Sequence, residues 1–232
     1  MSEKIIPAIS NTLEANQINQ HGFHLAYVSP RLLANQFLAS DNQGLLSVSE
    51  YARFFRYIST ETNAKLIADI QAGFGNQLNT YFAGKELGAS GAQIIMLNDQ
   101  VYPAHSQTPN HFISDADLLG KLVALQDSQA DYDFTIWLKL DGVQFYGLAG
   151  LAKRIKIAQK LGITQIIIGH LDLVSYQLIQ AAPELANLII SQDNDQLALA
   201  DLMSLDCQAV IPDFTAIQNL KTTLKEELSY EI

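Results

Sequence analysis

Polar side chains that could do chemistry end a series of apolar runs along this chain. Carboxylates can hold a divalent metal, a lysine ammonium can stabilise an oxyanion, and an imidazole titrates near neutral pH. Helix caps and turns use many of the same residue types, so a structural role is the alternative at each position. The positions are Ser10, Asn11, Ser29, Asp69, Gln71, Asn98, Asp99, Lys139, Asp141, His170, Ser191 and Asp213.

The apolar runs themselves are rich in Ile, Val, Leu and aromatic residues. Most are continuous and do not strictly alternate with polar residues, which is typical of parallel strands buried on both faces. We therefore predict eight strands, over Lys4–Ser10, Phe23–Ser29, Lys65–Gln71, Ala92–Asp99, Phe134–Asp141, Gln165–His170, Ala186–Ser191 and Gln208–Asp213.

Segments with helical spacing lie between these runs. From Leu45 to Ile58 the apolar residues recur three and four positions apart, and Ser47 with Glu50 makes a capping-box pattern at the start of this helix. Similar spacing predicts further helices over residues 118–125, 148–161, 197–205 and 217–228.

Alternating strands and helices leave two architectures open, a doubly wound open sheet and a closed barrel. Eight strand–helix units in 232 residues leave no room for a second domain, and no Pro- or Ser-rich linker divides the chain. This favours an α/β fold, a single (β/α)8 TIM-type barrel domain over residues 1–232. In such a barrel the chemistry lies at the carboxyl ends of the strands, where the polar residues above are expected.

Composition excludes several classes of partner. The net charge of -10 argues against nucleic acid, which needs clustered Lys and Arg, and against docking on an anionic membrane surface. The single cysteine, Cys207, allows no intramolecular disulfide, and neither a signal peptide nor a membrane-spanning apolar stretch is visible. We therefore expect a cytoplasmic protein. Acidic residues after the seventh and eighth runs argue against the phosphate site of many barrels.

Five motifs, in order along the chain, resemble those of a known enzyme family. They are GFHLAYVS (Gly22–Ser29), ASDNQGLLSVSE (Ala39–Glu50), LIADIQAGFG (Leu66–Gly75), GASGAQIIMLNDQVYP (Gly88–Pro103) and IWLKLDG (Ile136–Gly142). The third is similar to L-V-D-A-D-T-G-Y-G and the fifth to I-I-A-R-T-D-A. On these motifs the chain is identified as a divergent member of the isocitrate lyase/phosphoenolpyruvate mutase superfamily, more like its mutase and hydrolase members than isocitrate lyase.

The resemblance implies a lyase- or mutase-like enzyme acting on a small 2-oxo or 2-hydroxy carboxylate, such as a pyruvate, oxaloacetate or phosphonopyruvate derivative. Members of this superfamily make or break C–C or P–C bonds through an enolate that Mg²⁺ stabilises, and they associate as homo-oligomers. The implied cofactor is therefore Mg²⁺, and the implied partners are a small carboxylate substrate and further copies of the chain in a dimer or tetramer.

Resemblance and position at strand ends together give the candidate site residues. His170 is a candidate general acid or base, although a capping or core histidine is the alternative. In the loop after the fourth run, Ser106 is a candidate substrate contact, and a solvated loop residue is the alternative. The candidates are Lys139, Asp41 and His170 for catalysis, Ser29, Asn11, Gly73, Gly75, Gln71, Asn98 and Ser106 for substrate binding, and Asp69 and Asp99 for the metal.

Departures from the family pattern are concentrated in the same places. The amides of Gln71 and Asn98 replace two carboxylates, which weakens attraction for Mg²⁺, and Lys139 replaces an arginine. Asn11 replaces an aspartate, and the loop after Pro103 lacks the family's lyase cysteine.

Three interpretations of these departures follow. Asp69, Asp41 and Asp99 hold a weak Mg²⁺, which binds only together with substrate; or the metal is lost and Lys139 with amide donors stabilises the enolate directly; or the barrel is catalytically silent and binds carboxylates or other subunits.

Overall fold

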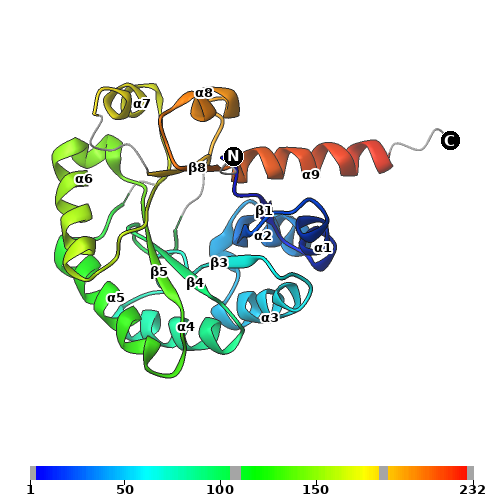
Figure 1. Ribbon diagram of the computed structural model, residues 1–232, viewed down its shortest axis with the longest axis horizontal. Helices are drawn as coiled ribbons and strands as arrows, with labels where there is room; N and C mark the ends of the chain where they lie inside the picture. Colours follow the sequence, from blue (N-terminus) through cyan, green and yellow to red (C-terminus); the bar gives the residue numbers. More distant parts are fainter. Residues whose placement is uncertain (1–3, 105–110, 183–187, 229–232) are drawn as a thin grey trace.

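The chain folds as a ring of parallel strands surrounded by helices (Figure 1). This computed structural model describes residues 4–104, 111–182 and 188–228. Each strand pairs in parallel with the next one along the chain, which confirms the predicted (β/α)8 TIM-type architecture. The strands are β1 (Ala8–Ile9), β2 (Leu25–Val28), β3 (Lys65–Asp69), β4 (Ile94–Asn98), β5 (Thr135–Leu140), β6 (Ile166–Ile168), β7 (Ile189–Ser191) and β8 (Ala209–Ile211).

Every predicted strand contains its observed strand, but the observed strands are shorter. Most polar residues at the ends of the runs leave the ladder, although Ser191 stays in β7, and several of them cap the next helix. Asn11 accepts a hydrogen bond from the backbone N–H of Glu14, and Ser29 accepts one from that of Leu32. Because a capping residue is the half-helical start of a helix, it can no longer extend the strand before it.

The ring closes between β8 and the segment before β1 through a short seam. A parallel bridge joins Ile5 to Val210. The backbone N–H of Ile6 donates to the carbonyl of Val210 over 2.9 Å, and the N–H of Val210 donates to the carbonyl of Lys4 over 2.8 Å. Pro7 has no N–H to donate, so the ladder is interrupted there and β1 is only two residues long.

Alternate side chains of the strands fill the inside of the ring. Successive strand residues point to opposite faces, so Asp69, Lys139 and Ser191 face inward like the apolar residue two positions before each of them. The polar inward residues therefore lie on top of the apolar lumen, at the carboxyl ends of the strands. The lumen core comprises Ile6, Tyr27, Ile67, Ile94, Met96, Trp137, Ile167, Ile189, Ala209 and Ile211.

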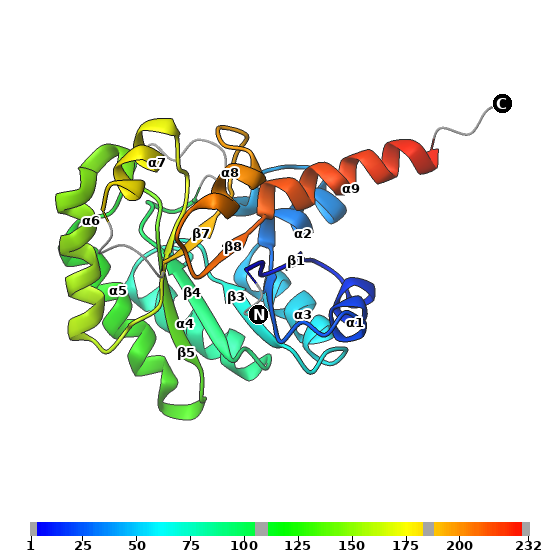
Figure 2. The same cartoon turned by 45° about the horizontal axis from the view of Figure 1, so that its top comes forward.

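The helices form the outer layer around the strands (Figure 2). Their buried apolar residues pack with those of the strands in one core. Ser47 and Glu50 form the predicted capping box at the start of α3. Leu45, predicted within this helix, instead lies before its cap in a 3-10 turn, where its side chain is exposed. The helices are α1 (Thr12–Gln20), α2 (Pro30–Leu38), α3 (Val48–Ser59), α4 (Gln77–Ala89), α5 (Asp115–Asp127), α6 (Val143–Lys160), α7 (Leu173–Gln180), α8 (Leu199–Ser204) and α9 (Asp213–Leu228).

Candidate active site

Lys139, at the carboxyl end of β5, holds a buried positive charge among carboxylates. Its side chain is 7% exposed, and its Nζ lies 2.7 Å from Asp193 Oδ1 and 3.5 Å from Asp141 Oδ1. Burial by itself lowers the pKa of a lysine, but the charges of Asp141, Asp193 and Asp69 outweigh it and raise the pKa of Lys139. The ammonium therefore stays protonated inside the mouth of the barrel.

Asp193, just after β7, organises this group through both carboxylate oxygens and its carbonyl. Its Oδ1 accepts from Lys139 and from the Ser191 hydroxyl at 3.0 Å, and its Oδ2 accepts from the backbone N–H of His170 at 3.1 Å. Its carbonyl oxygen accepts from Arg31 Nη1 at 2.8 Å. Burial acts to raise the pKa of Asp193, but Lys139 and His170 hold it well below its usual range.

His170 follows β6 in a left-handed backbone conformation, with φ 52°. Its ring is buried, and neither nitrogen has a hydrogen-bond partner. Nε2 lies 3.9 Å from Asp193 Oδ2 and 4.0 Å from Asp141 Oδ2. Burial lowers the pKa of His170, so the imidazole is neutral at pH 7. Strained backbone at a buried polar residue is typical of functional sites, and the acid–base role stays a prediction.

Asp69, Gln71 and Asn98 lie at the ends of β3 and β4. Asp69 accepts from the Tyr27 hydroxyl at 2.7 Å and from the backbone N–H of Gln71 at 2.6 Å, and burial raises its pKa to about 6. Gln71 has φ 51°, its amide nitrogen donates to the carbonyl of Gln43, and its Oε1 has no partner. The Oδ1 of Asn98 accepts from the backbone N–H of Gln100.

Asp99 is held on the outer side of β4, because it follows the inward-facing Asn98. Its Oδ2 accepts from Arg154 Nη1 at 2.7 Å and from the Tyr146 hydroxyl at 2.8 Å, both on α6. Its Oδ1 accepts from the backbone N–H of Asp141. Burial and the charge of Asp141 raise the pKa of Asp99 to about 6. A metal role for Asp99 stays a prediction, and the carboxylate is engaged by α6.

Ser29, Asn11 and Asp41 hold helices in place. Ser29 and Asn11 are the N-caps of α2 and α1. Asp41, after α2, accepts from Asn35 at 2.8 Å and pairs with Lys221 of α9 at 3.0 Å. Their substrate-binding and catalytic roles stay predictions. Ser106 lies outside the described residues.

The glycines after β3 form a tight turn. Gly73 has φ 76°, and a Cβ there would lie 2.1 Å from Thr80 Oγ1, at the first buried turn of α4. Gly75 has φ 140°, and a Cβ would lie 2.6 Å from Asn79 Oδ1. Both positions therefore require glycine for the turn itself. Contact of this backbone with a ligand stays a prediction.

Two residues of this cluster, Asp193 and Arg31, were not among the predicted site residues. Asp193 is the first of the acidic residues after β7, which composition alone marks only as unfavourable for phosphate. The alternation of side chains along a strand could have indicated it. Asp193 lies two residues beyond Ser191 and four beyond Ile189, both of which face inward, so its side chain is expected on the same side. Arg31 follows Ser29 and Pro30 at the start of α2, where nothing in the sequence distinguishes it from a surface arginine.

Asp141, His170 and Asp193 form a group that could hold a divalent cation, with one ligand atom from each lying within 4.8 Å of the others. Lys139 Nζ, however, lies beside two of these three ligands, 2.7 Å from Asp193 Oδ1. Mg²⁺ also prefers oxygen ligands to imidazole nitrogen. The arrangement therefore fits the lysine ammonium better than it fits Mg²⁺, which could bind here only if Lys139 moved away.

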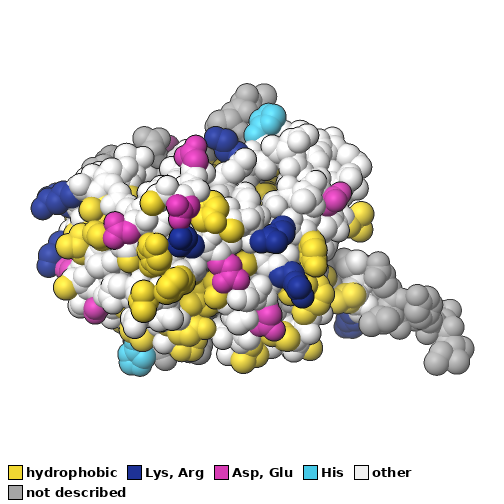
Figure 3. All heavy atoms as spheres, turned by 90° about the horizontal axis from the view of Figure 1, so that it is seen from below, with side chains coloured by type: hydrophobic (Ala, Val, Ile, Leu, Met, Phe, Trp, Pro, Cys, Tyr) yellow, Lys and Arg dark blue, Asp and Glu magenta, His cyan; other side chains and the backbone are white. Residues whose placement is uncertain are grey.

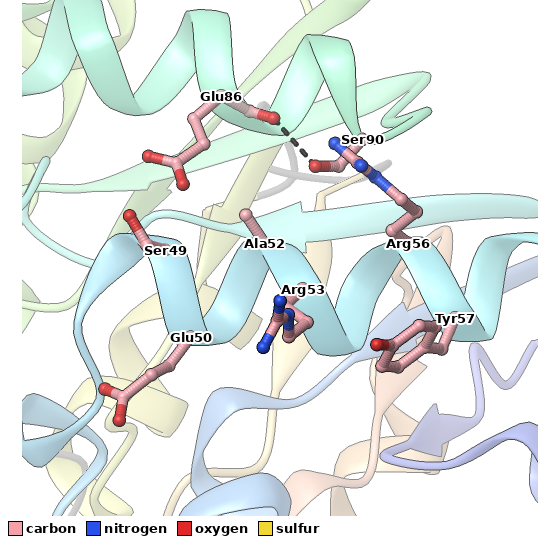
Figure 4. Close-up of a pocket in the computed structure, with 8 residues that line it drawn as sticks. All are labelled: Ser49, Glu50, Ala52, Arg53, Arg56, Tyr57, Glu86 and Ser90. Atoms are coloured by element: carbon pink, nitrogen blue, oxygen red, sulfur yellow. Dashed lines mark hydrogen bonds between the residues drawn. The ribbon is translucent and has the colours of Figure 1, made fainter.

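A groove on the outer wall is separate from this cluster. It has a volume of about 470 Å³ and runs between α3 and α4, and Figure 4 shows Arg53 and Arg56 of α3 together with Glu50 and Glu86 at its walls. It shares no lining residue with the strand ends, and its charges are of both signs. Its geometry assigns it no part in the chemistry of the barrel mouth.

Relatives of the chain are enzymes. No sequence profile of a known protein family matches it. Phosphonopyruvate hydrolase from Variovorax sp. (strain Pal2) is 27% identical over 151 residues, covering 63% of this chain and 50% of that protein. 2,3-dimethylmalate lyase from Eubacterium barkeri is 27% identical over 139 residues, covering 59% and 48%. The chain thus spans about half the length of these relatives.

Solved structures agree with the sequence comparison. Phosphonopyruvate hydrolase in complex with oxalate and Mg²⁺ superimposes with a TM-score of 0.78 at 25% identity, covering 97% of this chain and 80% of that chain. A crystal structure of 2,3-dimethylmalate lyase, described as a PEP mutase/isocitrate lyase superfamily member, gives a TM-score of 0.78 at 17% identity with the same coverage. The chain belongs to the PEP mutase/isocitrate lyase superfamily. This superfamily member has Lys139 at the centre of its polar cluster, where the family motif has an arginine.

Proposed function

We propose that the chain is an enzyme of lyase, mutase or hydrolase type, which makes or breaks a C–C or P–C bond in a small 2-oxo or 2-hydroxy carboxylate. The relatives support this class, because they include a phosphonopyruvate hydrolase, a 2,3-dimethylmalate lyase and an oxaloacetate decarboxylase. All three names describe reactions of small carboxylic acids in which an enolate is the natural intermediate.

The observation that carries the proposal is the charged, buried Lys139 at the carboxyl end of a barrel strand. An enolate oxyanion needs a fixed positive charge or preorganised donors in a site shielded from water. Lys139 supplies such a charge, and Asp141 and Asp193 keep it protonated and restrict its position. The neutral His170 next to it is suited to take or give a proton at the carbon that becomes the enolate.

The proposal gives Mg²⁺ no essential part, because its binding here is expected to be weak. The superfamily implies Mg²⁺, and the structure with oxalate shows that a relative binds it. Here Lys139 lies beside the candidate ligands Asp141 and Asp193, and the amide oxygens of Gln71 and Asn98 are weaker ligands than carboxylates. We therefore assign the stabilisation of the enolate to Lys139 and derive no step through the metal.

Calorimetric titration with oxalate, a mimic of the enolate of pyruvate, tests this assignment. The wild type should bind oxalate without Mg²⁺, and Lys139→Met should weaken binding by about tenfold or more, because a charge-assisted hydrogen bond is lost. Lys139→Arg keeps the charge and should retain part of the affinity. Lys153→Met, an exposed lysine, is the matched control.

The outcomes separate the alternatives. If oxalate binding requires Mg²⁺ and its affinity is unchanged in Lys139→Met, the metal is the electrophile and Lys139 is structural. No binding of oxalate to the wild type, with or without Mg²⁺, would sink the enolate hypothesis altogether.

A second candidate is a silent barrel that binds carboxylates without turnover. It is favoured by the fact that many polar groups at the strand ends are already engaged, Lys139 with Asp193 and Asp99 with Arg154. Exchange of the pyruvate methyl protons in D₂O, followed by ¹H NMR, distinguishes the two. Oxalate binding with no exchange supports the silent barrel, whereas exchange that is lost in Lys139→Met supports the enzyme.

A further inference from the structure

Arg31 places a guanidinium group over the mouth of the barrel. The residue belongs to the first turn of α2, and its side chain is completely buried. Nη1 donates to the carbonyl of Asp193 after β7 over 2.8 Å, and the guanidinium carbon lies 5.8 Å from the ring centre of Phe214, just after β8. The arginine therefore reaches from the end of β2 across to the ends of β7 and β8.

One edge of this guanidinium has no partner. Nε and Nη2 of Arg31 are both buried, and neither makes a hydrogen bond. These two nitrogens lie on the same side of the planar group and point two parallel N–H bonds outward, which is the geometry that binds the two oxygens of a carboxylate. Buried charged donors without acceptors are costly, so this edge calls for an acceptor that the described residues do not provide.

Neighbouring side chains do not supply the acceptor. Asp213 feels the charge of Arg31, but it hydrogen-bonds with Ser29, its Oδ1 has no hydrogen-bond partner, and neither Nε nor Nη2 of Arg31 bonds to it. Both ring nitrogens of His170 are unpartnered as well. Asp193 connects the two residues with unpartnered nitrogens. Its carbonyl accepts from Arg31 Nη1, and its Oδ2 accepts from the backbone N–H of His170.

We propose that the Nε–Nη2 edge of Arg31 binds a carboxylate group of the ligand that is separate from the enolate oxygen held by Lys139. This rests on the proposed function and deepens it: Lys139 holds the pyruvate-like end of the ligand, with its enolate oxygen and the carboxylate beside it, and Arg31 holds a second carboxylate at the other end. The site therefore selects small dicarboxylates whose two carboxylates are separated by at least one carbon, such as malonate, over monocarboxylates. Because the edge is buried, a carboxylate that reaches it is desolvated, and its hydrogen bonds are strengthened.

NMR of the arginine Nε–H groups tests this directly. The chain has only four arginines, Arg31, Arg53, Arg56 and Arg154, so the spectrum is simple, and Arg31→Lys assigns the Arg31 signal by its disappearance. Malonate is the dicarboxylate probe and pyruvate the monocarboxylate probe. We expect malonate to shift the Arg31 signal in the wild type, while the exposed Arg53 does not respond and pyruvate shifts Arg31 far less.

Calorimetry on variants gives the second readout. Arg31→Lys should lower malonate affinity by about tenfold or more, because a lysine cannot make the bidentate contact, and should lower oxalate or pyruvate affinity far less, because these ligands occupy only the Lys139 end of the site. Arg53→Lys, on the outer face of α3, is the matched control and should change neither.

The two hypotheses fail in different ways. Saturation with malonate that moves none of the four arginine Nε–H signals overturns the carboxylate role of Arg31, even if Arg31→Lys proves too unstable to assign its signal. If oxalate or pyruvate binds normally in that case, the proposed function survives. If no small carboxylate binds the wild type, both the proposed function and the role of Arg31 are wrong.

Discussion

Lys139, Asp193 and Arg31 show how buried charges balance at the level of single residues. The cations Lys139 and Arg31 lie among several carboxylates, and the contacts of each carboxylate decide whether it stays ionised. Asp193 accepts hydrogen bonds from both sides of the mouth and keeps a depressed pKa, whereas burial raises the pKa of Asp213 to about 6. Removing one partner from such a group leaves the other charge buried and uncompensated, which costs about 3–5 kcal/mol.

Asp213→Asn is expected to change the pH dependence of stability. The folded-state pKa of Asp213 lies above its unfolded value, so its contribution is fully present below pH 4 and is lost as pH rises through about 6. The ionised carboxylate therefore costs up to about 3 kcal/mol at pH 7.5. The variant should be more stable than wild type at pH 7.5, with no gain at pH 4, in urea unfolding followed by circular dichroism.

The exposed Asp206→Asn is the control for this measurement, because it removes the same charge without a buried partner. A loss of stability in Asp213→Asn at pH 7.5 would contradict the prediction and would mean that Arg31 depends on the Asp213 charge.

At the scale of elements, residues at the loop–helix boundaries fix where the site residues lie. Six helices begin at an N-cap side chain of Ser, Asn or Asp that accepts a backbone N–H within the first turn. Ser29 and Asn11, candidate substrate contacts, are two of them. A cap and a binding role are compatible, because a helix N-terminus directs further N–H groups to the same place.

Ser47→Ala tests the capping box of α3. Two hydrogen bonds are lost, from the N–H of Glu50 to the Ser47 hydroxyl and from that hydroxyl to the Glu50 carboxylate. We expect a loss of about 1 kcal/mol in the free energy of unfolding. Ser49→Ala, two positions along on the exposed face, makes no such contacts and should change stability much less. Equal losses in the two variants would show that the box contributes nothing of its own.

Gly169→Ala tests the packing at the end of β6. A Cβ there would lie 2.2 Å from Asp141 Oδ1, 2.5 Å from Asp193 Oδ2 and 2.7 Å from Lys139 Cε. These side chains are held by their mutual contacts, so we expect a loss of about 1–3 kcal/mol and weaker oxalate binding. Gly120→Ala, within α5, should cost much less, because its Cβ would lie 3.1 Å from Nε2 of the Gln77 side chain and alanine favours a helix. Unchanged oxalate binding in Gly169→Ala would show that the cluster tolerates displacement.

At the scale of the whole molecule, the ring, its seam and its outer surface determine what the barrel can do. α9 projects away from the ring beyond α2 (Figures 1 and 2), and its residues from Lys221 to Glu226 are exposed. Figure 3 shows a face where apolar side chains alternate with acidic and basic ones. Exposed apolar residues on α4 and α5 include Leu78, Phe82, Leu119 and Val123. Association into a dimer or tetramer, and a cytoplasmic location, stay predictions.

No helix within the described residues is long and apolar enough to cross a bilayer. The predicted absence of nucleic acid as a partner rests on charge alone and likewise stays a prediction.

Hydrogen exchange tests whether the seam is as stable as the rest of the ring. The amides of Ile6 and Val210 bond across it, and opening it would expose the lumen core to water. We therefore expect these two amides to exchange with the same free energy as amides of β3 and β4, while the amide of Thr222 on the projecting α9 exchanges much faster. Fast exchange at Ile6 beside slow exchange in β4 would mean that the ring opens at its seam.

Local patterns in the sequence are enough for the barrel and its framework. Continuous apolar runs indicate parallel strands, and Ser47 with Glu50 indicates the start of α3, because both signals depend on neighbours close in the chain. α4 is a counterexample, because its buried face of Thr80, Ala83, Gly84 and Leu87 is made largely of small residues that carry no hydrophobic signal. Gly84 is needed there because a Cβ would meet Ser128 Oγ at 2.1 Å.

Only the tertiary structure decided how the site residues pair. Lys139 and Asp193 are 54 positions apart, and Arg31 and Asp193 are 162 apart, so no local spacing brings them together. Side-chain direction separates Asp99 from Asn98, although they are adjacent in the sequence. The sequence by itself determined a barrel with polar residues at its strand ends. Their partners depend on the closed ring, because ring closure brings the ends of distant strands to one place and removes the water that would otherwise screen their charges.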